Sequence, residues 1–169
     1  MNTQNPMELN PLSKEESRRL KNYKFEIRVR YSETDMSGNP HHSKYFVWLE
    51  ESRHALLRKL GLSYRVMEED GVFFPTVEAN CRLLSPVKMD DIIEIQPKIQ
   101  SANRRFVKIG YVISTREEEP QKVAEAETMH VSVNAEGKAT SLPPGYLDLL
   151  KKLQQIQKTR TNARVPTFG

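Results

Sequence analysis

The apolar pattern between Ser43 and Leu60 constrains the fold of this chain more than any other feature of its sequence. Apolar side chains recur there at three- and four-residue steps, which is the spacing of one face of an α-helix. They are Tyr45, Phe46, Trp48, Leu49, Ala55, Leu56, Leu57 and Leu60. Gly61 follows, at a position where helices commonly end. The pattern predicts a helix over residues 43–60 that is deeply buried along one side.

Alternating segments lie on both sides of this helix. One precedes it and places on its apolar face Tyr23, Phe25, Ile27, Val29 and Tyr31. Four more lie within residues 76–83, 93–99, 107–113 and 123–133, and tight turns between them imply antiparallel pairing. A long helix and a sheet must bury their apolar faces on each other. The sequence therefore predicts an α+β fold in which an antiparallel sheet wraps around one central helix.

The two ends of the chain differ from its middle. Residues 1–22 form a polar leader, in which Ser13 and Glu16 have the spacing of a helix-capping box and predict a short helix. Residues 23–150 form the folded domain, and a last short helix is expected after Pro144. Residues 151–169 form a basic tail.

The net charge of +4 comes from that tail, which holds five basic residues and no acid, so that residues 1–150 carry −1. A balanced body argues against a nucleic-acid partner, and the usual role of such a tail is solvation. The longest apolar run, Tyr45–Leu49, is far shorter than the roughly 20 residues of a membrane span. The polar N-terminus lacks a secretory signal, and the single cysteine, Cys81, agrees with a reducing compartment, so we expect a cytoplasmic protein.

The segment from Tyr31 to Tyr45 joins the end of the first strand to the start of the helix, and it is the best candidate for a site. The first amides of a helix have no carbonyl partner and carry partial positive charge, so they can stabilise an oxyanion. Asp35 lies just before them in the sequence. A carboxylate beside oxyanion donors suits acyl transfer or hydrolysis, although most loop aspartates only cap turns.

Other chemistries lack their motifs. The four histidines do not have metal-ligand spacing, and no cysteine pair is present, so we expect no metal. The sequence also contains no phosphate-binding loop, no dinucleotide fingerprint and no Gly-x-Ser-x-Gly elbow, so we expect no nucleotide cofactor and no serine nucleophile.

The sequence resembles the hotdog-fold acyl-CoA thioesterases of the 4-hydroxybenzoyl-CoA thioesterase type over about residues 23–150. The resemblance rests on Tyr31-x-Glu33-Thr34-Asp35-x-x-Gly38, His42-x-x-Tyr45, Trp48-x-Glu50-x-x-Arg53 and Leu60-Gly61-Leu62. It implies a five-stranded hotdog sheet around the helix, and a homodimer or homotetramer with active sites between subunits. It also implies hydrolysis of an acyl-CoA to a free acid and coenzyme A, without a cofactor.

The resemblance assigns roles to particular residues. Asp35 attacks the thioester carbonyl or activates a water, and the backbone N–H of His42, its imidazole, or both assist. Gly38 and Tyr45 belong to the substrate site. The phosphates of coenzyme A need cations, for which Arg82, Arg104, Arg105 and Lys108 are candidates, with a plain solvent-facing role as the alternative.

Some points stay open in the sequence. The family usually has two small apolar residues where this chain has Asn39-Pro40, which affects how the loop enters the helix. That departure supports a rival hypothesis, a non-catalytic acyl-binding or assembly protein; a thioesterase acting on acyl carrier protein is a second rival. We interpret Glu33 as an outward ion-pair partner, and expect Glu50 and Arg53 to form a salt link at i and i+3 on the helix.

Overall fold

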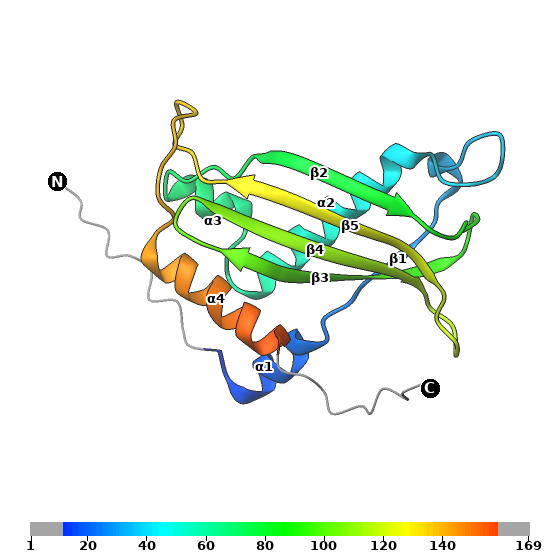
Figure 1. Ribbon diagram of the computed structural model, residues 1–169, viewed down its shortest axis with the longest axis horizontal. Coiled ribbons are helices and arrows are strands. Elements are labelled where there is room, and N and C mark those ends of the chain that lie inside the picture. Colours follow the sequence, from blue (N-terminus) through cyan, green and yellow to red (C-terminus); the bar gives the residue numbers. More distant parts are fainter. Residues whose placement is uncertain (1–11, 159–169) are drawn as a thin grey trace, which may run out of the picture.

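The computed structural model describes residues 12–158, and Figure 1 shows a curved sheet backed by one long helix. The helices are α1 (Lys14–Lys21), α2 (His42–Lys59), α3 (Tyr64–Glu69) and α4 (Pro144–Lys158). The strands are β1 (Phe25–Arg28), β2 (Thr76–Leu83), β3 (Ile92–Ala102), β4 (Phe106–Thr115) and β5 (Lys122–Val131). They pair antiparallel in the order β1-β3-β4-β5-β2. The predicted α+β fold is confirmed.

Helix α2 crosses behind the sheet and forms the core with it (Figure 1). Its buried side chains include Trp48, Leu49 and Leu56, and the strands contribute buried isoleucines at positions 93, 95, 109 and 113. Burial of each large side chain contributes about 1.5–3 kcal/mol. The predicted helix is confirmed to within one residue at each end, but Phe46 is 39% exposed because the sheet covers only one side of α2.

The first strand is shorter than predicted. Pairing of β1 with β3 ends where Arg28 lies opposite Ile92, since β3 begins there, and Val29 makes the last backbone bonds, with Asp90 and Asp91 before β3. The chain then turns, and Tyr31 starts the 3₁₀ turn Tyr31–Glu33 with a side chain that is 80% exposed. Placing Tyr31 on the buried face was therefore wrong.

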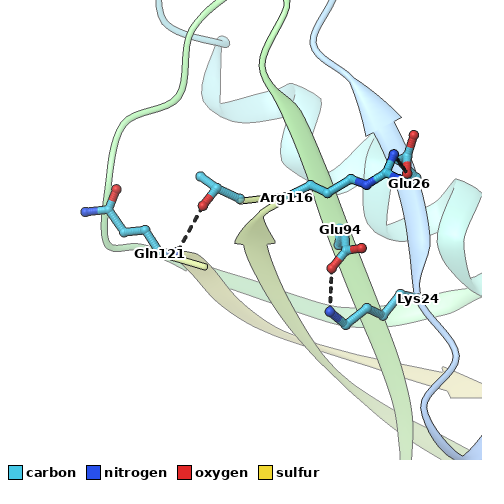
Figure 2. A network of polar contacts seen from close by, with 6 residues as sticks. Lys24, Glu26, Glu94, Arg116 and Gln121 are labelled. Carbon is cyan, nitrogen blue, oxygen red and sulfur yellow. Dashed lines mark hydrogen bonds and ion pairs between the residues drawn. The ribbon is translucent and has the colours of Figure 1, made fainter. Parts of the chain in front are cut away.

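Ion pairs join the short strand β1 to its neighbours (Figure 2). Lys24, which precedes β1, pairs with Glu94 of β3, and Arg116 pairs with Glu26 of β1 at 2.6 Å. Gln121 N–H donates to Thr115 Oγ1 at 2.9 Å and closes the neighbouring β4–β5 connection. Because the paired side chains are partly or largely exposed, each pair contributes only about 0–1 kcal/mol.

Both flanking helices belong to the folded body. Helix α1 begins at a Ser13–Glu16 capping box, as predicted, and Leu20 on it lies in the core. Helix α4 continues past the predicted domain boundary at residue 150 as far as Lys158, because Leu153 is fully buried. The rest of the predicted leader and of the basic tail, residues 1–11 and 159–169, lies outside the described residues.

Helix α4 also covers the part of β3 that β1 does not reach. Gln157 Oε1 accepts the Ile99 N–H at 2.9 Å, and Gln157 Nε2 donates to the Pro97 carbonyl at 3.0 Å. One side-chain amide thus satisfies a backbone donor and a backbone acceptor that β1 does not reach, because its ladder with β3 ends at Phe25 opposite Ile95. This contact protects an open sheet edge.

Replacing Gln157 with Ala will lower the free energy of unfolding by about 1–3 kcal/mol, because both backbone groups lose their partner in a partly buried place. Urea denaturation monitored by circular dichroism measures this. Lys151→Ala, at an exposed position of the same helix, is the control and will change the value by less than about 0.5 kcal/mol. Equal stability of the two variants would show that the Gln157 contacts do not stabilise the edge.

No helix within residues 12–158 is long and apolar enough to cross a membrane.

Candidate active site

The loop between the 3₁₀ turn and α2 is a small hairpin that is fixed by its own backbone. Asp35 N–H donates to the Asn39 carbonyl, Gly38 N–H to the Asp35 carbonyl, and His41 N–H to the Glu33 carbonyl, each at 2.9 Å. Gly38 has a φ of +75°, a conformation that side-chain-bearing residues rarely adopt. The hairpin therefore holds Asp35 in one place relative to the start of α2.

The Asn39-Pro40 departure fits this hairpin. Thr34 and Pro40 face each other as a bridge whose hydrogen bonds are made by their neighbours Glu33, Asp35, Asn39 and His41. Pro40 thus occupies a position at which the backbone N–H is not used, so the missing donor costs nothing. The Asn39-Pro40 departure therefore no longer favours a non-catalytic protein.

The carboxylate of Asp35 is bound on one oxygen only. Oδ1 accepts the Ser37 N–H at 2.8 Å and the Ser37 hydroxyl at 2.5 Å. These bonds lower the pKa of Asp35 below its ordinary value, with smaller contributions from the charges of His41 and Lys88. The side chain is exposed in the single chain. Asp35 is therefore an ionised carboxylate, and no bond to its Oδ2 occurs within residues 12–158.

Helix α2 opens beside this loop. His41 is its N-cap, and its Nδ1 accepts the Ser43 N–H at 3.3 Å. His42 is the first helical residue, so its amide belongs to the first turn, in which amides lack an intrahelical partner. The His42 side chain is exposed, and its ring centroid lies 4.1 Å from that of His41. The sequence placed the helix start and the carboxylate together, and the structure does the same.

A small cavity adjoins the loop. Its volume is about 290 Å³, and it is lined by Asn39, Pro40, Tyr45, Leu83, Leu84, Ser85 and Pro86. Tyr45 is 3% exposed, packs 4.9 Å from the Trp48 ring, and burial raises its pKa. The cavity is apolar on the β2 side, and both Leu83 and Leu84 remain more than 40% exposed in the single chain. Tyr45 thus has the position that an acyl-pocket residue needs.

The four basic candidates do not lie together. Arg82 is next to the cavity residue Leu83 at the end of β2, whereas Arg105 accepts a backbone bond from Ser132 near the start of β2. The two ends of β2 are about 23 Å apart. In one chain, the structure therefore brings Arg82 to the Asp35 end and leaves Arg104 and Arg105 at the opposite end. Lys108 pairs with Glu127 at 2.7 Å.

One cation near the loop was missed by the sequence reasoning. Lys88, between β2 and β3, donates from Nζ to the Ser37 carbonyl at 3.3 Å. Its own backbone N–H donates to Asp91 Oδ2 at 2.7 Å, which fixes the turn that carries it. Nothing in the sequence links position 88 to position 37, because only the folded chain brings these two loops together.

Two further predictions about charged residues were wrong. Glu33 does not point outward: it is 7% exposed, and its Oε1 accepts the indole N–H of Trp48 at 3.0 Å. Arg53 is 4% exposed, and its Nε donates to the Tyr64 hydroxyl at 3.1 Å. No ion pair between Glu50 and Arg53 occurs within residues 12–158, because Glu50 is exposed while Arg53 is buried beneath α3.

The described part of the chain contains no cluster of three or more His, Cys, Asp or Glu side chains that could hold a metal ion. The site chemistry available there is one ionised carboxylate, the His42 amide at the start of a helix and an adjoining cavity.

Most of the chain is similar to a known protein family. Residues 29–153 match the family model of the thioesterase-like superfamily. A protein of Aquifex aeolicus named "Putative esterase" is 34% identical over 124 residues, which cover 73% of this chain and 94% of that protein. The acyl-CoA thioester hydrolase YbgC of Escherichia coli O157:H7 is 29% identical over 79 residues, which cover 47% of this chain and 59% of YbgC.

A solved structure shares the fold. The structure of a 4-hydroxybenzoyl CoA thioesterase mutant with 4-hydroxybenzoyl CoA superposes with a TM-score of 0.71 at 21% identity, covering 77% of this chain and 99% of that one. This similarity identifies the sheet-wrapped helix as a hotdog fold.

Proposed function

Because the chain belongs to the thioesterase-like superfamily, we propose that it hydrolyses acyl-CoA thioesters to a free carboxylic acid and coenzyme A. The observation that carries the proposal is the placement of Asp35. Its ionised carboxylate lies in a rigid hairpin that leads directly into the open first turn of α2, beside the cavity that Tyr45 lines. Hydrolysis of a thioester needs only such a carboxylate and an oxyanion donor, because sulfur overlaps the carbonyl poorly and the thiolate leaves readily.

The residues divide the reaction between them. Asp35 removes a proton from a water that attacks the carbonyl carbon, or attacks that carbon itself through its free Oδ2. The carbonyl electrons move to oxygen, and the amide of His42 donates to the oxyanion that forms. Collapse of this intermediate expels the thiolate of coenzyme A, which takes up a proton. A positioned base contributes about 10²–10⁴ in rate and an oxyanion donor about 10²–10³.

The two roles of Asp35 leave different traces. As a nucleophile it forms a mixed anhydride, and when water cleaves this at the Asp35 carbonyl, one Asp35 oxygen leaves in the first acid produced and a water oxygen replaces it. Unlabelled acid from a single turnover in H₂¹⁸O would therefore assign the attack to Asp35. His42 has a backbone role that survives replacement of its side chain, so His42→Ala distinguishes its amide from its imidazole.

Coenzyme A would be bound by the loop backbone and by cations near Asp35. Gly38 presents the backbone of the loop to substrate, and Arg82 together with Lys88 supplies positive charge at the same end of the sheet. Arg104 and Arg105 reach this site only from a second copy of the chain, since they lie at the far end of their own sheet.

A thiol-release assay tests the proposed activity. Short-chain, long-chain and aromatic acyl-CoAs are offered, and free thiol is followed by its reaction with a chromogenic disulfide. We expect kcat/KM of at least about 10⁴ M⁻¹s⁻¹ for the preferred substrate. Tight binding of an acyl-CoA without thiol release would contradict hydrolysis and favour an acyl-binding protein, whereas faster turnover of acyl-carrier-protein esters would assign the carrier protein as substrate.

We propose further that the active form is a homodimer or a homotetramer in which a second copy covers β2. This strand is at the edge of the sheet, and all of its residues except Cys81 are exposed in the single chain. Its exposed apolar side chains include Val77 and Leu83, and Val47 of α2 is exposed as well. A second copy would cover these side chains and close the shallow cavity, which water exclusion from the site requires.

A matched pair of substitutions tests this interface. Ala79→Glu places a carboxylate in the middle of β2, and by symmetry two carboxylates in each interface, at a cost of at least about 1–3 kcal/mol each. We expect it to produce monomers in analytical ultracentrifugation and to abolish most activity. Ala135→Glu, an identical change at an exposed turn, is the control. An active monomer, or an unchanged oligomer for Ala79→Glu, would contradict an interface at β2.

We also propose a cytoplasmic location, with Cys81 present as a free thiol.

A further inference from the structure

Glu33 forms a bridge between the Asp35 hairpin and α2 that the reaction as described does not use. Glu33 is 7% exposed, and its carboxylate accepts two N–H donors, one on each oxygen. Oε1 accepts the indole N–H of Trp48 at 3.0 Å, and Oε2 accepts the backbone N–H of Arg30 at 2.9 Å. The carbonyl of the same residue accepts the His41 N–H at 2.9 Å. Glu33 therefore contacts the chain before the hairpin, the N-cap of α2 and the buried face of α2.

The partner of Glu33 on the helix is rigid. Trp48 is fully buried and packs against Tyr45, which lines the cavity beside the hairpin. The carboxylate thus fixes the hairpin to a part of α2 that cannot move without disturbing the core. The distance between Asp35 and the His42 amide depends on this attachment, because the Glu33 side chain bonds the hairpin to the body of α2 in addition to the chain connection through Pro40 and His41.

We infer that Glu33 is a positioning residue for thioester hydrolysis, which sets the carboxylate of Asp35 relative to the amide of His42 by anchoring the hairpin to Trp48. The inference rests on the proposed function. A carboxylate suits this role because it is only an acceptor when ionised, and both groups that face it are donors. A Gln side chain in its place would turn its own NH₂ group toward one of these donors and lose that contact.

The test is kinetic. Glu33→Gln will lower kcat for thiol release about 10- to 100-fold and leave KM within about twofold, because an error of about 1 Å at the reacting atoms costs up to about 10²-fold while the surfaces that bind coenzyme A are unchanged. Glu118→Gln, at an exposed position of the β4–β5 loop, is the matched control and will retain wild-type kinetics. Emission of Trp48, the only tryptophan in the sequence, reports whether its contact with residue 33 has changed.

A second background separates positioning from general damage. If Glu33 acts through Asp35, then Glu33→Gln added to Asp35→Asn will cost less than about twofold more, because the group being positioned is already lost. An equal fold loss in both backgrounds would overturn the inference, and so would a Glu33→Gln enzyme with wild-type kcat. Trp48→Phe removes the indole donor and keeps an aromatic ring, so it decides the question by the same criteria if Glu33→Gln does not fold. If the wild-type protein released no thiol, the proposed function would itself be contradicted, and the positioning role of Glu33 with it.

Discussion

Replacing Asp35 with Asn will lower kcat for thiol release at least about 100-fold, because Asn neither accepts a proton from water nor attacks a carbonyl. We expect KM to change little, since the amide has the same shape as the carboxylate and keeps an oxygen to accept the Ser37 bonds. Steady-state kinetics with the preferred acyl-CoA measure both quantities. The residual rate comes from the His42 amide of α2, which the substitution leaves in place.

The control for this prediction is Asp148→Asn, the same chemical change at an exposed position of α4, which we expect to retain wild-type kinetics. Circular dichroism of both variants establishes that they are folded. If the Asp35→Asn protein turned over at close to the wild-type rate, Asp35 would have no part in the mechanism, whichever acyl-CoA is the preferred substrate.

Acidification will destabilise the protein through His130, an effect unrelated to the active site. The side chain is fully buried, with Nε2 2.8 Å from Thr128 Oγ1 and Nδ1 3.2 Å from Thr76 Oγ1. Burial, with a smaller contribution from the charge of Arg53, lowers its pKa to about 3. The folded protein therefore keeps His130 neutral, while the unfolded chain protonates it below about pH 6.5.

The sign of the effect follows from that difference. Below about pH 6.5 the unfolded state binds one more proton at this site than the folded state, so stability falls as the pH falls, until the folded form is itself protonated near pH 3. One such group lowers the free energy of unfolding by about 2–3 kcal/mol between pH 7.5 and pH 4.5. Urea denaturation at several pH values and one protein concentration measures this loss.

His130→Gln provides the comparison, because Gln fills similar space without titrating. Between pH 7.5 and pH 4.5 we expect this variant to lose about 2–3 kcal/mol less of its free energy of unfolding than the wild type does. The contributions of carboxylates and of His54 are common to both proteins and cancel in this difference. If the variant does not fold, an NMR titration of the wild-type His130 ring gives the answer. A midpoint above pH 5 in the folded protein would contradict the prediction.

Much of the fold could be predicted from the sequence because its signals are local and periodic. The three- and four-residue apolar spacing located α2 to within one residue at each end, and the period-two alternation located the strands. The errors arose where a strand needs a partner. Tyr31 continued the alternation of the first strand, but β3 had no residue left to pair with it. Phe46 continued the helical pattern on a side that the sheet of the same chain does not cover.

The candidate site divides in the same way. Asp35, Gly38, His42 and Tyr45 could be proposed from the sequence because they are close in sequence and flank a helix start. Lys88 was missed, Glu33 was interpreted as an outward ion-pair partner and Arg53 as the salt-link partner of Glu50, because their actual partners lie on segments that sequence spacing does not relate to them. A buried charged residue and an exposed one read alike in a sequence, since burial depends on what the rest of the chain places over them.

The sequence by itself therefore determined the elements, their order and the short segment proposed as the active site, since backbone hydrogen bonding and side-chain periodicity act over a few residues. The tertiary structure decided which oxygen of Asp35 is bound, why Pro40 is tolerated, how Glu33 anchors the hairpin to Trp48, and that Arg104 and Arg105 lie far from Asp35. The first two depend on the backbone geometry of the hairpin, and the last two on distances between segments that are brought together only when the sheet closes around α2.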